Sequence, residues 1–469
     1  MAGWTSQEVA RLVDGVLVGD SALSCAGCVL DSRQATAGSM FFALPGARVD
    51  GFDYIGAAWA QGAVLAVAAR DSYRERPLPV PAGKALVLVD SPLSALQILA
   101  REHRRALGAK VVGITGSNGK TTTKDMVAAV LGQRYRVHKN QGNQNNELGL
   151  PLTILNAPHG TEFLVLEMGM RGLGEIRALC AIAQPEAGVI TNIGTTHLEL
   201  LGSRENIARA KWELVEALPP GGVAVLNAED EWSVRQAAGD AHPQVFYGLG
   251  GAYREPDIRG CSLEVAGELG TRFTAITARE QETVYLPLPG EHNVLDGLAA
   301  LALGSVYGVS LAEGARGLRG LELSKMRLEV WPGVCGSTLI SDVYNANPVS
   351  MQASLKVLRE RAGARPTVAI LGEMYELGPA SLAGHREVGE AAAKLGIDEL
   401  ITVGGMAADI AEGARAAGLA AERIHAAGTR SEAVALARQV LAVREGAWVL
   451  IKGSRGMKME EITAGLLAR

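Results

Sequence analysis

The strongest chemical signal in the chain is a glycine-rich run, GITGSNGKTT, at residues 113–122. It follows an apolar stretch typical of a buried strand and precedes an amphipathic helix that we expect over residues 124–131. Backbone N–H groups in such a loop converge on phosphate oxygens, and the helix N-terminus adds partial positive charge. Lys120 would neutralise the terminal phosphates, and the Thr121 hydroxyl would bind Mg²⁺. The nucleotide-binding residues that we predict are Thr115, Gly116, Ser117, Asn118, Gly119, Lys120 and Thr121.

This loop departs from the strict eight-residue P-loop, because Ile114 stands where that pattern has glycine. We therefore expect a shorter variant of the loop. A glycine-rich turn that binds no ligand is the alternative interpretation. The Asn-Lys-x-Asp run that reads guanine is absent from the sequence, which argues against a GTPase.

Two further polar residues follow predicted strands downstream. Glu167 ends a strand expected at 163–167, and His197 follows one expected at 188–191. Ligands of open α/β sheets gather at the carboxyl ends of the strands, so both side chains could hold a second metal ion against the same phosphates. Taken singly, each is better explained as a surface acid or a structural histidine, and it is their matching placement that favours a metal site. Lys211 lies one helix later, where a lysine is usually solvated.

Composition limits the class of protein. The 469 residues are 48% hydrophobic and 20% charged, which favours about three well-packed domains over extensive disorder. The net charge of −5 gives no general attraction for nucleic acid or an anionic membrane. The N-terminus lacks a secretory pattern, and the longest uncharged stretch, residues 297–312, is too short to span a bilayer. We expect a cytoplasmic protein with no nucleic-acid partner and no membrane insertion.

The five cysteines are scattered and odd in number, which argues against a disulfide framework and for a reducing compartment. Cys25 and Cys28 have the spacing of half a zinc site. The sequence has no second Cys-x-x-Cys pair or close His pair to complete such a site. Buried or unreactive thiols are therefore the favoured interpretation.

The elements that must position these residues fall into three segments, 1–105, 106–322 and 323–469. Strands are expected at 40–44, 63–67 and 85–89, at 111–115, 163–167 and 188–191, and at 368–372, 400–404 and 448–452. Continuous apolar strands separated by helices indicate parallel sheets covered on both faces, and shorter alternating pieces at 240–290 indicate an antiparallel addition. We predict an α/β protein of three domains: an N-terminal α/β domain, a central P-loop domain and a C-terminal Rossmann-like doubly wound sheet.

The loop at 116–121, together with Glu167, His197 and Lys211, resembles the Mur ligases, ATP-dependent enzymes that form amide bonds in peptidoglycan precursor synthesis. The resemblance spans nearly the whole chain. It includes NQNNELGLP at 143–151, GEHN at 290–293 and DVYNANP at 342–348. Residues 31–33, 41–46 and 50–52 are similar to the UDP-sugar domain of that family.

The resemblance implies roles for further residues. Asn145 and Asn146 would lie near the substrate and the transferred phosphate, His292 and Asn293 would contact adenine, and Asp342 would meet the ribose. Ser32 and Arg33 would bind the UDP-sugar.

A further implied role belongs to Arg327, which would face the phosphates. The family's Pro-Gly-Arg is Lys325-Met326-Arg327 here, so the glycine of the hinge is lost. The implied catalytic residues are Lys120, Glu167, His197, Lys211 and Arg327, and the implied metal ligands are Thr121, Glu167, His197 and Lys211.

The reaction implied by the resemblance uses ATP and two Mg²⁺ ions to add D-alanyl-D-alanine to UDP-N-acetylmuramoyl-tripeptide through an acyl phosphate. The protein would act as a monomer. Lys211 would be carbamylated, which requires that it lose its proton to capture CO₂. The third residue of the tripeptide, lysine or diaminopimelate, is left open by the sequence.

Other interpretations remain open at this point. Another Mur-type ligase, or a folylpolyglutamate-type ligase, would share the loop and the acyl-phosphate chemistry, although the latter does not usually carry about 100 residues before the loop. A noncatalytic P-loop binding protein is a third class. The turn Lys452–Arg455 is a candidate for binding the dipeptide, and the alternative is that it is an ordinary solvated basic turn. Glu373 and His385 are weaker candidates for the same role.

Overall fold

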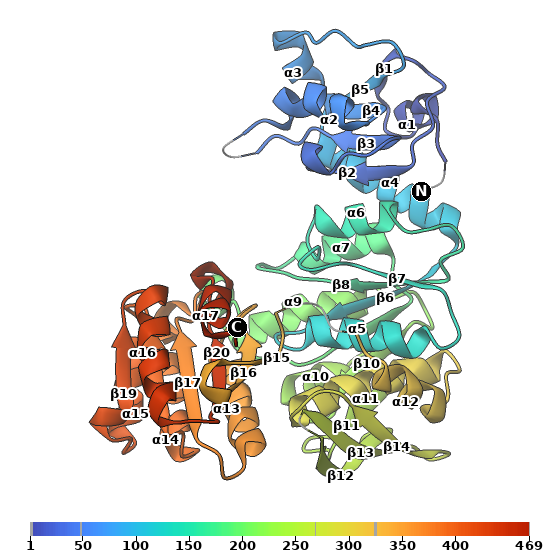
Figure 1. Cartoon of the computed structure of the whole chain (residues 1–469). Coiled ribbons are helices and arrows are strands. Elements are labelled where there is room, and N and C mark those ends of the chain that lie inside the picture. The colour runs from blue at the N-terminus through green and yellow to red at the C-terminus, as the bar shows by residue number, and fades with distance from the viewer. Residues whose placement is uncertain (1–2, 47–48, 268, 323–325, 469) are drawn as a thin grey trace.

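The computed structural model describes residues 3–46, 49–267, 269–322 and 326–468. Lys325 lies outside the described residues. Within them the strands form three sheets, one in each of the three segments that the sequence predicts. The N-terminal sheet lies at one end of the molecule, and the C-terminal sheet lies beside the central one (Figure 1). The predicted fold class, three α/β domains, is confirmed.

The N-terminal domain has a sheet of order β1-β5-β4-β3-β2, in which only β1 runs antiparallel. The strands are β1 (Val16–Gly19), β2 (Gly27–Val29), β3 (Ser39–Phe42), β4 (Leu65–Ala69) and β5 (Ala85–Val89). The helices are α1 (Ser6–Leu12), α2 (Ile55–Gln61), α3 (Arg70–Glu75) and α4 (Pro92–Leu107). α4 packs on the central domain, so one apolar core continues from Leu96 of this helix into Ile154 and Leu164.

The central domain has a sheet of order β14-β13-β12-β11-β10-β9-β6-β8-β7. Its strands are β6 (Lys110–Thr115), β7 (Val137–Lys139), β8 (Phe163–Glu167), β9 (Ala187–Ile190), β10 (Val223–Asn227), β11 (Gln244–Gly248), β12 (Ile258–Ala266), β13 (Gly270–Ile276) and β14 (Gln281–Leu286). Its helices are α5 (Lys120–Leu131), α6 (Gly149–Leu155), α7 (Glu175–Ala183), α8 (Leu198–Leu201), α9 (Arg204–Glu216), α10 (Glu231–Ala237), α11 (Glu291–Val306) and α12 (Leu311–Arg319).

Helices cover both faces of the central sheet. Leu298 of α11 and Met126 of α5 pack on one face, and Ile176 of α7 and Leu214 of α9 pack on the other. The antiparallel prediction for residues 240–290 is correct only for β12–β14. It is wrong for β11, which runs parallel to β10 because the helix α10 connects them as a crossover.

The C-terminal domain has a sheet of order β15-β16-β20-β17-β18-β19, parallel except for β15. Its strands are β15 (Glu329–Pro332), β16 (Thr338–Asp342), β17 (Thr367–Gly372), β18 (Glu399–Val403), β19 (Ile424–Ala427) and β20 (Trp448–Lys452). Its helices are α13 (Pro348–Ala362), α14 (Ser381–Lys394), α15 (Ala408–Ala416), α16 (Arg430–Val443) and α17 (Glu460–Leu466). α13–α15 pack on one face and α16 and α17 on the other, which confirms the doubly wound sheet.

No helix within the described ranges is both long and apolar enough to cross a bilayer.

Candidate active site

A cavity of about 730 Å³ lies between the central and C-terminal domains. Most of the predicted site residues line it: Ser117, Asn118, Gly119, Lys120, Thr121, Asn145, Asn146, Glu167, His197, Lys211, His292, Asn293, Arg327 and Asp342. They come from strand ends and loops far apart in the sequence. Gln97 of α4 also lines the cavity, so all three domains reach it.

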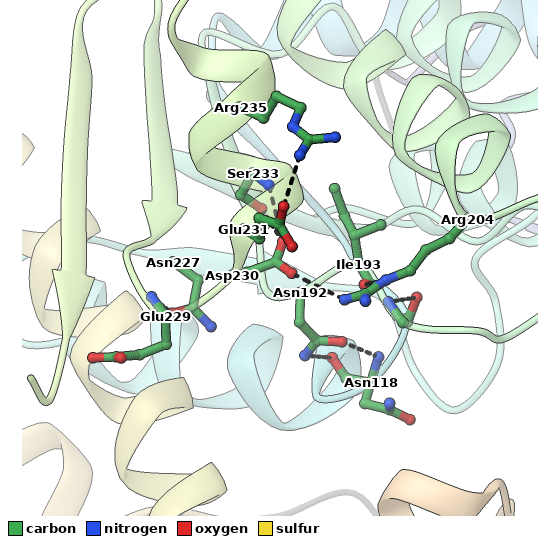
Figure 2. Close-up of polar contacts among 12 residues, drawn as sticks. Asn118, Asn192, Ile193, Arg204, Asn227, Glu229, Asp230, Glu231, Ser233 and Arg235 are labelled. Atoms are coloured by element: carbon green, nitrogen blue, oxygen red, sulfur yellow. Dashed lines mark hydrogen bonds and ion pairs between the residues drawn. The ribbon is translucent and has the colours of Figure 1, made fainter. Parts of the chain in front are cut away.

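The phosphate loop is shaped by contacts with the segment that follows β9. α5 begins at Lys120, earlier than predicted, and Gly119 before it has φ +80°, where a Cβ would lie 2.5 Å from an Asp296 oxygen. The N–H of Ser117 donates to the Asn192 carbonyl at 2.8 Å. The side chain of Asn192 bonds both backbone groups of Asn118 (Figure 2). Glycine is therefore required at 119, and the loop shape depends on residues more than 70 positions away.

Two of the predicted nucleotide-binding residues do not line this cavity. The Thr115 hydroxyl is buried and donates to the Met168 carbonyl at 2.9 Å. The Gly116 carbonyl accepts a hydrogen bond from Lys120 Nζ at 2.7 Å. Burial lowers the pKa of Lys120, against an opposing effect from Glu167. In this arrangement the Lys120 ammonium group, which we expect to bind phosphate, donates its hydrogen bonds to carbonyl groups of the loop itself.

Glu167 and Thr121 form the part of the site suited to Mg²⁺. Thr121 Oγ1 donates to Glu167 Oε2 at 2.8 Å, and Asn145 Nδ2 donates to Glu167 Oε1 at 2.7 Å. The Glu167 side chain is only 3% exposed, and no cation makes an ion pair with it among the described residues. Arg327 donates to Thr121 Oγ1 at 2.9 Å and lies over the Tyr344 ring.

This donor set fits Mg²⁺, which prefers hard oxygen ligands and completes its shell with phosphates and water. A buried carboxylate held only by neutral donors is costly without a counter-charge. The described residues contain no group of three or more His, Cys, Asp or Glu side chains able to hold a metal by themselves.

Lys211 occupies the other side of the cavity in an unusual state for a lysine. Its side chain, on α9, is 2% exposed and has no hydrogen bond or ion pair within the part of the chain that is described. Burial, with a smaller effect from the charge of Lys120, lowers its pKa well below the ordinary value. The sequence expectation of a solvated lysine is wrong, because α9 buries this face against the sheet. A neutral amine is the form that can add CO₂.

His197 has a left-handed backbone conformation, φ +65°, and directly precedes the short helix α8. Its Nδ1 lies 3.1 Å from Glu376 Oε2 of the C-terminal domain. Burial lowers its pKa to about 4, and the charges of Lys211 and Lys120 act in the same direction. A neutral imidazole is the form that binds metal.

The remaining polar lining comes from α11 and the C-terminal domain. Asp342 pairs with Lys452 Nζ at 2.5 Å, and Asn347 donates to Asn118 Oδ1 at 2.6 Å. Lys452 is 3% exposed, so the interpretation of a solvated turn is wrong for this residue. Burial lowers the pKa of His292 to about 4.

Several sequence candidates lie elsewhere. Arg33 is exposed and pairs with Asp31, and Ser32 is buried in the same turn, so the structure does not bring them to this cavity. His385 is fully buried, accepting the Met374 N–H and meeting the Ser381 carbonyl, which makes it structural. A buried imidazole with both nitrogens occupied cannot bind a dipeptide.

Two other candidates from the sequence also lie outside this cavity. Glu373 accepts the Met406 N–H. Cys25 and Cys28 are both buried, which agrees with the interpretation of buried thiols.

The lining residues that the sequence reasoning missed include Asp296 and Glu376. Asp296 follows Asn293 and His292 by three and four residues, so helical spacing could have placed it on the same face of α11. Glu376 carries no such signal, because its position depends on how the C-terminal domain docks.

Asp296 yields a prediction about stability. Its side chain is 6% exposed, and burial raises its pKa from 3.8 to about 8 against the opposing effect of a hydrogen bond with Thr123. Between those values the folded state keeps a proton that the unfolded chain has lost, so stability falls as pH rises through this window. We expect Asp296→Asn to stabilise the ligand-free protein at pH 8.5 by about 1–3 kcal/mol. Thermal unfolding of both proteins from pH 5 to 8.5 checks this, and parallel pH profiles would contradict it.

Comparison with protein families identifies the class. The model described as "Mur ligase family, catalytic domain" matches residues 25–104, "Mur ligase middle domain" matches 114–304, and "Mur ligase, glutamate ligase domain" matches 326–455. The chain belongs to the Mur ligase family.

Within that family, several similar curated proteins share one name. The chain is 39% identical over 470 residues to UDP-N-acetylmuramoyl-tripeptide–D-alanyl-D-alanine ligase of Bacillus subtilis, covering 99% of this chain and 98% of the relative. It is 34% identical to the protein of that name from Escherichia coli, with 99% of each covered.

Solved structures agree. MurF from Acinetobacter baumannii has a TM-score of 0.86 at 31% identity, with 98% of each chain covered. MurF ligase from Thermotoga maritima, in complex with ADP, has a TM-score of 0.78 at 30% identity over 94% of this chain and 96% of the other. A folylpolyglutamate synthase from Mycobacterium tuberculosis, at 18% identity, shares the fold alone.

Proposed function

We propose that the protein is an ATP-dependent ligase that adds D-alanyl-D-alanine to UDP-N-acetylmuramoyl-tripeptide in peptidoglycan precursor synthesis. The observation that carries the proposal is the convergence of the phosphate loop, Glu167, His197 and the buried Lys211 on one cavity. The names of full-length relatives at 34–39% identity supply the substrates. The domain limits that we propose are 1–105 for the UDP-sugar, 106–322 for ATP, and 323–469 for the closing domain.

The proposed reaction has two steps. The terminal carboxylate of the tripeptide attacks the γ-phosphorus of ATP, which gives an acyl phosphate and releases ADP. The amine of the dipeptide loses a proton and attacks the acyl carbon, and the tetrahedral intermediate collapses to the amide and inorganic phosphate. Such a reaction is accelerated mostly by positioning and by neutralising charge.

Each part of the cavity has a role in these steps. Lys120 and Arg327 offset negative charge on the phosphates, and the loop N–H groups at the start of α5 orient them. Thr121 and Glu167 would hold one Mg²⁺, and His197 with a carbamate on Lys211 would hold a second. The ions, when bound, neutralise charge that develops during phosphoryl transfer. Closure of the third domain over the cavity would exclude water that would hydrolyse the acyl phosphate.

For the base and ribose of ATP, we propose His292, Asn293 and Asp342, on the wall formed by α11 and the end of β16. Asn145 and Asn146 line the same cavity, and Asn145 donates to Glu167, so we propose that the tripeptide carboxylate approaches there. Ser32 and Arg33 remain our proposal for the UDP-sugar, on the separate N-terminal domain.

A second cavity of about 290 Å³ continues from the first and suits the dipeptide. It is lined by His197, Tyr344, Glu376, Ser454 and Arg455. A dipeptide carries an ammonium and a carboxylate, and this cavity offers a carboxylate at Glu376 and a guanidinium at Arg455. Charge complementarity therefore favours this cavity, in which the amine would face the first.

We expect Arg455→Ala to raise the KM for D-alanyl-D-alanine about tenfold and to leave kcat within about twofold, because a charge-assisted contact to the substrate is lost. Steady-state kinetics with varied dipeptide measures this. The control is Arg386→Ala, which removes a surface arginine paired with Glu412 on the same domain. Equal KM values for the two variants would argue against Arg455.

The proposed function is tested with purified protein, ATP, UDP-N-acetylmuramoyl-tripeptide and D-alanyl-D-alanine. We expect one phosphate released for each amide formed. Without the dipeptide, hydroxylamine should capture the acyl phosphate as a hydroxamate. ATP hydrolysis without amide product, or no turnover, would contradict the proposal and favour a noncatalytic nucleotide-binding protein.

A further inference from the structure

Three asparagine side chains in the structure each bond both backbone groups of one distant residue. Asn140 bonds Glu167, Asn192 bonds Asn118, and Asn156 bonds Cys28. A carboxamide presents an acceptor and a donor side by side, so it can replace the neighbouring strand that a backbone segment lacks. Two of the three residues held in this way belong to the nucleotide site.

Asn140 completes the sheet at the end of β8. β7 ends at Lys139 while β8 continues to Glu167, so the backbone of Glu167 has no strand partner on that side. Asn140 Oδ1 accepts the Glu167 N–H at 2.9 Å, and Asn140 Nδ2 donates to the Glu167 carbonyl at 3.1 Å. Asn140 is 1% exposed, so water cannot substitute for these bonds.

The same side chain also fixes the loop that approaches the Glu167 carboxylate. Asn140 Nδ2 donates to the Gln144 carbonyl at 2.8 Å, and the next residue, Asn145, donates to Glu167 Oε1. The Asn140 carbonyl accepts from the buried ammonium of Lys124 at 2.8 Å. The Asn140 side chain therefore fixes the position of Glu167 relative to Asn145, whose amide group contacts the Glu167 carboxylate.

Asn192 holds the backbone of the phosphate loop in the same way that Asn140 holds the backbone of Glu167. Asn118 N–H donates to Asn192 Oδ1 at 3.1 Å, and Asn192 Nδ2 donates to the Asn118 carbonyl at 3.1 Å (Figure 2). The Thr191 hydroxyl donates to the same carbonyl, and the Gly194 N–H donates to Ser117 Oγ at 2.8 Å. This segment leads on to His197, so it joins the two sides of the cavity.

We propose that Asn140 and Asn192 are positioning residues with separate tasks: Asn140 orients Glu167 for Mg²⁺, and Asn192 holds the phosphate loop in the shape that binds the triphosphate. The inference rests on the ATP and Mg²⁺ site of the proposed function. It does not depend on the identity of the acceptor or of the amine.

The test is calorimetric titration of the full-length protein with a non-hydrolysable ATP analogue at several Mg²⁺ concentrations. Asn192→Asp removes the N–H group that donates to the Asn118 carbonyl of the phosphate loop. We therefore expect the analogue's Kd at saturating Mg²⁺ to rise about tenfold. Asn140→Asp should leave that Kd within about twofold and raise the Mg²⁺ concentration for half-maximal binding about tenfold.

The matched control is Asn156→Asp, which breaks the same pair of bonds at Cys28, away from the cavity. We expect it to lower the Tm without changing either binding parameter. If Asn140→Asp does not fold, Asn140→Ser can be used, because the serine hydroxyl can bond one of the two backbone groups of Glu167. This variant should raise the Mg²⁺ concentration for half-maximal binding about threefold.

Two results would overturn the proposal: equal effects of the Asn140 and Asn192 variants on both parameters, or effects no larger than those of Asn156→Asp. Analogue binding by the unsubstituted protein that is independent of Mg²⁺ would overturn the assignment of Asn140. Because every readout is binding, a failure to form amide refutes the proposed function and leaves this test intact.

Discussion

Lys211→Ala is expected to lower the rate of amide formation by at least about a thousandfold, the scale seen when a preorganised charge is removed from a transition state. Lys211 is buried without an acceptor among the described residues, and its pKa is well below the ordinary value, so it is suited to become a carbamate. Alanine cannot carry that group. A short carboxylic acid should enter the vacated space and partly restore the rate.

The carbamate can also be observed directly. Protein equilibrated with ¹³C-bicarbonate should show a carbamate carbon signal that is absent from Lys211→Ala. Lys394→Ala removes an exposed lysine paired with Glu390 and serves as the control. Unchanged turnover of Lys211→Ala, or a carbamate signal that survives the substitution, would remove Lys211 from the proposed site.

Glu167→Gln is expected to lower kcat by about a hundred- to a thousandfold. The substitution keeps the shape of the side chain and can keep hydrogen bonds to Thr121 and Asn145, but it removes the negative charge that suits Mg²⁺. The Mg²⁺ concentration for half-maximal rate should therefore rise as well. Initial rates at varied Mg²⁺ and saturating ATP measure both effects.

The control for this prediction is Glu213→Gln. Glu213 is also 3% exposed, but its carboxylate accepts the N–H groups of Gly174 and Arg177 outside the cavity. We expect Glu213→Gln to lower the Tm and to leave the Mg²⁺ requirement unchanged. If both variants lose activity equally with the same Mg²⁺ dependence, the role of Glu167 is structural.

Much of the architecture could be read from local patterns. The apolar runs at 163–167 and 448–452 coincide with β8 and β20, because buried parallel strands need continuous apolar residues and are bounded by turns. The helix after the phosphate loop was predicted from Lys124, although it begins at Lys120. Its first turn is rich in threonine and lacks the apolar period, so the pattern alone does not show where it starts.

The state of the charged residues could not be predicted in this way. A lysine at position 211 is solvated in most helices, and only the packing of α9 on the sheet buries it. The contact of Asn118 with Asn347 joins residues 229 positions apart, and that of Thr121 with Arg327 joins residues 206 apart. No periodicity records such pairs, because each depends on how two independently folded domains meet.

The sequence by itself determined the three-domain α/β plan and the loop where a triphosphate is expected, since strand period, glycine turns and helix starts are set by neighbouring residues. Tertiary structure alone decided which side chains line the same cavity and that Lys211 is buried. It also decided which backbone groups Asn140 and Asn192 bond. Burial and charge environment are sums over the whole surrounding shell, and that shell is assembled from parts of the chain that are remote in sequence.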